Sequence, residues 1–243
     1  ARNKIISIDE PTSITPWQRQ EGRPIGQPIM YECIGLFKSV DDIASSPSQL
    51  AIGVPIVGDR KYLDYNVDGV INTLDRFAQG YSNIPEISYG FSFGGNYKGF
   101  DFSVLLQGVD HVSLTFWKGQ NNNELGRWNP FLTAEQNANA TYPTLHSNSG
   151  SGGAINNSVT SFGVFGNVYN GAYLKLKNVE IGYSLPKSWI KSIGISAVRI
   201  YTNGVNLAIL KDYLIFFDPE SGSGAGTFYP QMRVINCGFN ITF

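Results

Sequence analysis

Acidic and amide side chains recur at alternate positions within the sequence DYNVDGVINTLD. Oxygen-bearing side chains occupy positions 1, 3, 5 and 12 of this stretch, a glycine occupies position 6, and position 7 offers a backbone carbonyl. Ca²⁺ binds about six to eight oxygen ligands, and this spacing folds alternate side chains around one ion. The sequence therefore predicts a structural Ca²⁺ site. The residues concerned are Asp64, Asn66, Asp68, Gly69, Val70 and Asp75.

Two features separate this stretch from a complete EF-hand. Position 12 holds Asp75, which is one methylene shorter than the usual glutamate, so bidentate ligation is weaker. No helical pattern flanks the stretch, so we expect an EF-like acidic loop over residues 58–76 inside a longer surface loop. The alternative is a metal-free turn rich in Asp and Asn.

Residues suited to catalysis are scarce, and we predict no catalytic site and no enzymatic activity. The two histidines, His111 and His146, lie in no metal spacing and beside no nucleophile motif. Aromatic side chains in the long connection after residue 110 could stack on a sugar or peptide, or pack that loop against itself, so substrate-binding residues stay unassigned. They are Trp117, Trp128, Tyr142, Phe162 and Phe165.

The composition favours β-structure with one face against an apolar environment. Of 243 residues, 15% are charged and 13% aromatic, 27 are glycine, and the formal net charge is −1. A near-neutral chain lacks the basic surface of a nucleic-acid-binding protein. No apolar stretch is long enough for a membrane helix. Cys33 and Cys237 lie far apart in strand-like runs, and we expect free thiols.

Strict alternation of apolar and polar residues predicts antiparallel strands. ISYGFSFGGNY and FDFSVLLQG form a predicted hairpin with a tight turn at Lys98 and Gly99. NVEIGYSLP, SAVRIYTNGVNLAIL (with imperfect alternation) and INCGFNITF are further strands. A bulge or the end of a strand is expected near Asn178, where the alternation changes phase. Another strand is expected at 29–37, and the opening ARNKIISI reads as the tail of an earlier one.

The connections favour a transmembrane barrel over a soluble sandwich. Short turns alternate with very long loops, as in outer-membrane barrels, and the chain closes on an alternating aromatic strand. Five or six strands cannot close such a barrel, since open edges in lipid leave backbone groups unpaired. The fold class is therefore all-β, a transmembrane antiparallel β-barrel, with residues 1–243 as the C-terminal strands of a larger barrel.

Several motifs resemble the C-terminal part of SusC/RagA-type TonB-dependent outer-membrane transporters. They occur in the order of that family and cover nearly the whole chain. They are RPIGQP (23–28), GDRKYLDYNVDGVINTLDR (58–76), PEISYGFSFGGNYKGFDFSVLLQG (85–108), RWNP (127–130), ANATYP (138–143), GAYLKLKNVEIGYSLPKSW (171–189), VRIYTNGVNL (198–207), and the terminal YPQMR and FNITF.

The resemblance implies a barrel of about 22 strands around an N-terminal plug, with long extracellular loops. It implies residence in the outer membrane of a Gram-negative, Bacteroidota-type bacterium, in contact with lipid and lipopolysaccharide. It also implies energy from TonB, through a segment absent here, and a SusD-like surface lipoprotein partner. The implied function is uptake of oligosaccharides or peptides. The alternatives are a non-transporting surface barrel that scaffolds a lipoprotein complex, and a soluble calcium-stabilised β adhesin.

Overall fold

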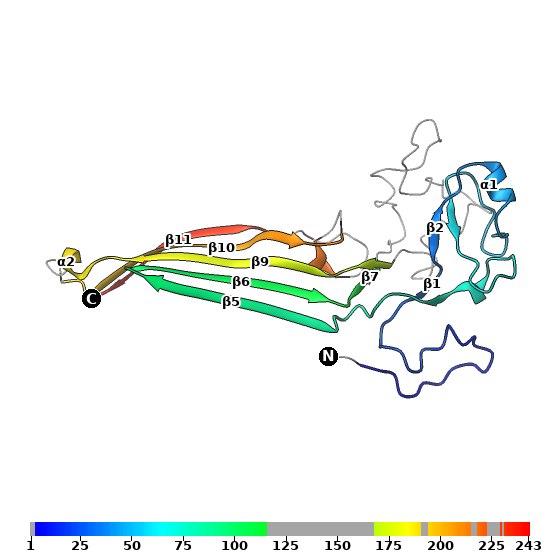
Figure 1. The fold of residues 1–243 in the computed structure, drawn as a ribbon, viewed down its shortest axis with the longest axis horizontal. Coiled ribbons are helices and arrows are strands. Elements are labelled where there is room, and N and C mark those ends of the chain that lie inside the picture. The colour runs from blue at the N-terminus through cyan, green and yellow to red at the C-terminus, as the bar shows by residue number, and fades with distance from the viewer. Residues whose placement is uncertain (1–2, 116–167, 191–193, 215–217, 223–228, 230) are drawn as a thin grey trace.

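Most of the chain is placed in two regions of unequal size (Figure 1). The computed structural model describes residues 3–115, 168–190, 194–214, 218–222, 229 and 231–243. One region is a sheet of long strands, and the other is a group of short strands, turns and one short helix at one end of that sheet. Among the described residues, no helix is both long and apolar enough to cross a membrane.

The large sheet is antiparallel and contains five strands in the order β11-β10-β9-β6-β5. Four of the five strands have 9 to 12 residues, which is close to the length that crosses a bilayer in a tilted barrel. The outer strands β5 and β11 pair with no further strand among the residues described. The bounds are β5 (Ile87–Tyr97), β6 (Phe100–Asp110), β9 (Tyr173–Ser184), β10 (Ala197–Lys211) and β11 (Val234–Thr242).

The pairing register divides the side chains of the sheet between two faces. Residues directly opposite each other on neighbouring strands share a face, because side chains alternate along each strand. One cross-strand row of the aromatic face is Tyr97, Phe100, Tyr183, Ile200 and Phe239. One row of the polar face is Ser103, Glu180, Asn203 and Asn236. The alternation in the sequence therefore predicted both faces correctly.

The turn between β5 and β6 consists of two residues, as predicted. Lys98 has φ 49° and Gly99 has φ 89°, so both central positions are left-handed. Paired positive φ values match the twist of a tight hairpin, which is why glycine is favoured here. The connection from β9 to β10 is also short and begins with α2 (Lys187–Ile190).

A bulge interrupts β9 where the sequence changes phase. Leu105 pairs with Asn178 and Leu106 pairs with Leu176, so Lys177 is the extra residue. Of the two alternatives expected near Asn178, a bulge or a strand end, the structure has the bulge. Opposite it on β10, the register shifts between Val205 and Ala208, with Asn206 at φ 54°.

The smaller region corrects the expected strand at 29–37. Its residues form two short strands that belong to separate two-stranded sheets, β1 with β4 and β2 with β3, while β7 pairs with β8. The segment 3–8 is not a strand; Ile5 instead exchanges backbone hydrogen bonds with Gly22 and Arg23. The bounds are β1 (Ile29–Met30), β2 (Cys33–Leu36), α1 (Val40–Ala44), β3 (Arg60–Tyr62), η1 (Thr73–Asp75), β4 (Phe77–Ala78), β7 (Ser113–Thr115), β8 (Val168–Asn170) and η4 (Pro219–Ser221).

The buried apolar side chains lie outside the large sheet's aromatic face. One cluster contains Tyr31, Ile52, Tyr62 and Ile71, and another contains Val112, Leu114 and Leu214. In contrast, Phe91, Phe93, Phe102 and Phe239 are exposed on the sheet. Both cysteines are free thiols, as predicted, and Cys237 lies on the aromatic face.

Candidate functional site

The acidic loop brings three of its predicted ligands together around one turn. The Asp64 carboxylate accepts hydrogen bonds from the backbone N–H of Gly69 at 2.7 Å and of Asp68 at 3.2 Å. The Asn66 amide donates to Asp68 at 2.8 Å. Hydrogen bonds from the backbone of Val70 and from the Asn66 side chain hold the pKa of Asp68 below its usual value. Positions 1, 3 and 5 therefore face the same turn.

A backbone bridge fixes the acidic loop to the smaller region. Ile71 N–H donates to the carbonyl of Ser48 at 2.8 Å, and Ser48 N–H donates to the carbonyl of Gly69 at 2.9 Å. The Ile71 side chain is fully buried beside Tyr62. Because this apolar anchor directly follows the acidic positions, the loop is held in place by packing on the core.

Asp75 closes the loop from within. Its side chain has no exposed surface and accepts hydrogen bonds from the backbone N–H of Tyr65 at 2.9 Å and of Asn72 at 2.7 Å. The Asn72 side chain in turn caps η1 by accepting a hydrogen bond from the backbone N–H of Leu74. Asp75 therefore has a structural role in addition to the predicted ligation, which the spacing of the sequence did not indicate.

The set of predicted Ca²⁺ ligands is mixed in chemistry. Among the described residues, no group of three or more His, Cys, Asp or Glu side chains is arranged to hold a metal ion. The predicted set also includes the Asn66 amide and the Val70 carbonyl, and that carbonyl accepts from the Asn72 side chain at 3.3 Å. A carboxylate oxygen that already accepts a hydrogen bond from an N–H group has a second lone pair, which is available to a metal ion. The site therefore stays a prediction.

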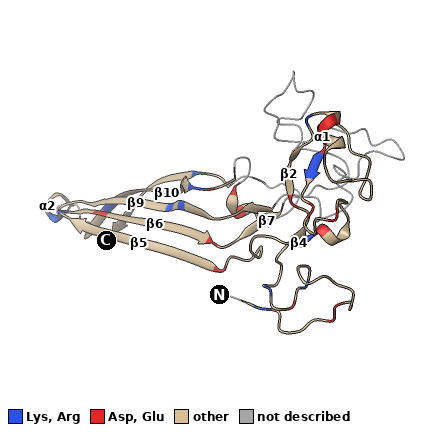
Figure 2. Ribbon diagram, turned by 45° about the vertical axis from the view of Figure 1, so that its right-hand side comes forward, with Lys and Arg blue, Asp and Glu red and all other residues tan. Residues whose placement is uncertain are grey.

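The polar face of the sheet carries an ion network near the short turns. Arg199 on β10 donates to Asp101 on β6 through two nitrogens, with Nε at 3.0 Å, and to Glu180 on β9 at 2.7 Å. Arg199 also lies over the ring of Tyr201. Few other charged residues occur along the five long strands (Figure 2). The network therefore ties together three strands on the polar face.

A second ion cluster lies on the polar face at the opposite end of β9. Lys175 is 3% exposed and donates to Asp218 at 2.6 Å and to Glu220 at 3.1 Å. Lys177 donates to both oxygens of Glu220, and Tyr173 donates to one of them. Burial raises the pKa of Glu220, but hydrogen bonds from the two lysines outweigh it and leave that pKa lowered.

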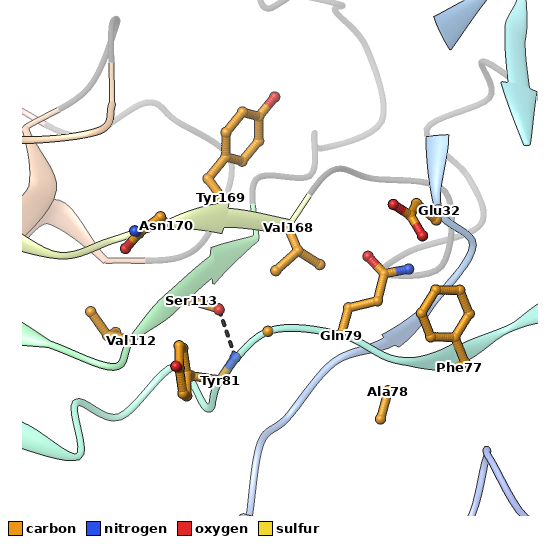
Figure 3. A pocket seen from close by; sticks show the side chains of 11 residues that line it. Glu32, Phe77, Ala78, Gln79, Tyr81, Val112, Ser113, Val168, Tyr169 and Asn170 are labelled. Carbon is orange, nitrogen blue, oxygen red and sulfur yellow. Dashed lines mark hydrogen bonds between the residues drawn. The ribbon is translucent and has the colours of Figure 1, made fainter. Parts of the chain in front are cut away.

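A pocket of about 450 Å³ opens between the segment that contains β4 and the β7–β8 pair (Figure 3). Tyr81 N–H donates to Ser113 at 2.8 Å across its floor, and the Tyr81 ring stacks on His111 outside it. Its size falls in the range of small-molecule sites. The labelled lining residues are Glu32, Phe77, Ala78, Gln79, Tyr81, Val112, Ser113, Val168, Tyr169 and Asn170.

Sequence reasoning missed the lysine cluster and the pocket. Lys175 and Lys177 stand two residues apart in a strand, which predicts a shared face, but their carboxylate partners lie more than forty residues later. His111 lies in a loop, as predicted, at φ 52° and beside Glu86. The motifs RWNP and ANATYP and the aromatic residues of the long loop fall outside the described residues.

Comparisons with known proteins agree with the resemblance stated from the motifs. No protein-family model matches the sequence. Two curated relatives from Formosa agariphila are TonB-dependent receptor P26, 27% identical over 86% of this chain, and TonB-dependent receptor P3, 26% identical over 92%. The chain spans only 22% and 23% of their lengths. They are named as receptors, not as enzymes.

Solved structures of similar fold include the RagAB peptide importer in its open-open state, with a TM-score of 0.55 and 21% identity. A structure of the RagAB peptide transporter gives a TM-score of 0.58 and 19% identity. They cover 90% and 95% of this chain but 23% and 24% of the matched chains. In sequence the chain is similar to part of these TonB-dependent receptors, and in fold it is similar to part of the RagAB structures.

Proposed function

We propose that residues 1–243 form the C-terminal part of a transmembrane barrel in the outer membrane of a Bacteroidota-type bacterium. The support is a sheet whose strands have bilayer length and whose two faces differ, one aromatic and one polar. The aromatic face contacts lipid and lipopolysaccharide, and the polar face lines the interior against a plug. The other strands of the barrel pair with the open edges of β5 and β11.

The whole receptor imports nutrients that are too large for porins. The matched proteins are named as TonB-dependent receptors or as peptide importers, and this likeness is the observation that carries the proposal. TonB supplies energy through the plug of the receptor, and a SusD-like surface lipoprotein delivers an oligosaccharide or peptide. This chain contributes wall, turns and loops, and no chemistry on the substrate.

Deletion of the gene tests import directly. The deletion strain should lose growth on one class of nutrient, and candidates to screen are defined oligosaccharides and peptides as sole carbon or nitrogen source. A receptor without its TonB-contacting segment should reach the membrane and fail to restore growth. If this variant restores growth fully, the receptor is a scaffold for a lipoprotein complex and the import proposal is wrong.

We further propose that the acidic loop binds one structural Ca²⁺ through Asp64, Asn66, Asp68, Val70 and Asp75. The support is the shared turn of positions 1, 3 and 5, together with the anchor at Ile71. Calorimetry on the full receptor in detergent, stripped with chelator and titrated with calcium chloride, should give heat that Asp64→Asn/Asp68→Asn abolishes. No heat at about millimolar Ca²⁺, the weak end of such loops, would disprove the site.

A further inference from the structure

Three donors on β9 converge on one carboxylate. Tyr173 and Lys175 stand at alternate positions on the polar face, and Lys177, the extra residue of the β9 bulge, contacts the same carboxylate. The Glu220 oxygens accept from Tyr173 Oη at 3.2 Å, from Lys175 Nζ at 3.1 Å and from Lys177 Nζ at 2.9 and 3.0 Å. Charge-assisted hydrogen bonds of this kind are among the strong ones in proteins. The three side chains therefore form a binding site for a carboxylate.

The carboxylates that occupy this binding site come from the chain itself. Residues 218–222, here called the carboxylate segment, follow β10 and lie back against β9. Asp218 caps the short turn η4, accepting from Glu220 N–H at 2.9 Å, and its carboxylate also accepts from Lys175. The two acidic side chains thus balance the two lysines in charge.

The burial of the lysines depends on this segment. Lys175 is 3% exposed and Lys177 is 21% exposed, although both project from the polar face of the sheet. That face is the proposed water-filled interior, so release of the segment would hydrate the lysines and leave no charge buried in an apolar core. A second state with free lysines is therefore accessible, which a fully apolar surrounding would forbid.

We propose that Tyr173, Lys175 and Lys177 form a binding site for carboxylate-bearing ligands, and that Asp218 and Glu220 occupy it as an internal substitute. An incoming carboxylate, from an acidic oligosaccharide or from an acidic peptide, displaces the carboxylate segment and takes over its hydrogen bonds. No covalent bond forms or breaks during the displacement. The proposal rests on the polar face being interior, and so deepens the proposed import function.

The test measures binding of small acidic probes to the full receptor in detergent. The probes are trigalacturonate, triglutamate and the neutral sugar maltotriose. Asp218→Asn/Glu220→Gln weakens the internal substitute, so it should bind at least one acidic probe about tenfold more tightly than the natural receptor. Adding Lys177→Gln to this variant should lower its affinity for that acidic probe about tenfold. Maltotriose binding should not change with any of these substitutions.

The matched control is Asp9→Asn/Glu21→Gln, which changes two exposed acidic side chains and alters the net charge equally. It should leave the affinity for both acidic probes unchanged. The proposal is overturned if Asp218→Asn/Glu220→Gln gains no affinity for either acidic probe, or if the control gains as much. A gain that survives Lys177→Gln also overturns it. Growth assays are not involved, so loss of import and loss of this site are distinguishable.

Discussion

At the scale of single residues, Asp75 shows how a predicted ligand can hold a loop together without any ion. Its buried carboxylate accepts from Tyr65 and Asn72, so alanine at this position leaves backbone N–H groups unpaired. We expect Asp75→Ala to lower the local stability of the loop by about 2 kcal/mol in chelator. Hydrogen exchange of the amides at 65 and 72 in the full receptor would measure this.

The matched control for Asp75 is Asp68→Ala, on the same loop. Asp68 is exposed and accepts mainly from the adjacent turn, so its removal should raise exchange only around Val70. Equal exchange at the amides of residues 65 and 72 in both variants would show that Asp75 does not close the loop.

The candidate sites were predictable only as far as their residues are close in sequence. The alternate spacing of Asp64, Asn66 and Asp68 predicted that they meet at one turn, since the chain between them is short. The burial of Asp75 depends on packing around Ile71, and the partners of Lys175 come from beyond β10. Contacts of such long separation leave no local pattern.

At the scale of elements, the turn between β5 and β6 sets the register of the hairpin. Gly99 has φ 89°, and a Cβ there would lie 3.0 Å from the carbonyl oxygen of Ser184. Gly99→Ala should therefore destabilise the barrel by about 1–2 kcal/mol, measured by urea unfolding of the full receptor. Lys98→Asn, at φ 49°, should be neutral or stabilising, because asparagine tolerates this conformation. A larger loss from Lys98→Asn would contradict this account.

The carboxylate segment should be released by acid. The pKa of Glu220 in the folded protein is below its ordinary value of 4.5, so its ion pairs stabilise the segment fully above that value. This stabilisation is lost as the pH falls below 4.5 through the lowered pKa of Glu220. The groups that face Glu220 are Tyr173, Lys175, Lys177 and Asp218.

Hydrogen exchange at residues 218–222, corrected for the intrinsic rate, should rise between about pH 5 and about pH 3. In Glu220→Gln, this rise in exchange should shrink, because the side chain whose protonation breaks the ion pairs is gone. Unchanged protection across this range in the natural receptor would contradict the assigned role of the ion pairs.

The long strands were predictable because their two environments impose a period of two over nine residues or more. The five strands of the sheet were predicted from this alternation, and the change of phase near Asn178 predicted the place where β9 is interrupted, but not whether a bulge or a strand end lies there. The expected strand at 29–37 divides into β1 and β2, whose partners β4 and β3 lie further along the chain. Strands of two to four residues are too short for a period to show.

At the scale of the whole molecule, substitutions at two adjacent residues of β6 allow the lipid side and the interior side of the sheet to be compared. Val104 lies on the aromatic face and Ser103 on the polar face, at the same depth along the strand. Val104→Arg should cost about 2–4 kcal/mol in lipid vesicles, whereas Ser103→Arg should cost less than half as much. Unfolding in urea from vesicles would measure both. Equal costs would contradict the assignment of the faces to lipid and interior.

The unpaired outer strands have a consequence for anyone who produces residues 1–243 alone. Among the described residues, β5 and β11 each have one edge that pairs with no further strand, and phenyl rings beside these edges are exposed. In water, such sheet edges pair with the same edges of other copies of the chain. A recombinant fragment would therefore grow into ordered fibrils or inclusion bodies, and antibodies raised against it would recognise that aggregate better than the native cell surface.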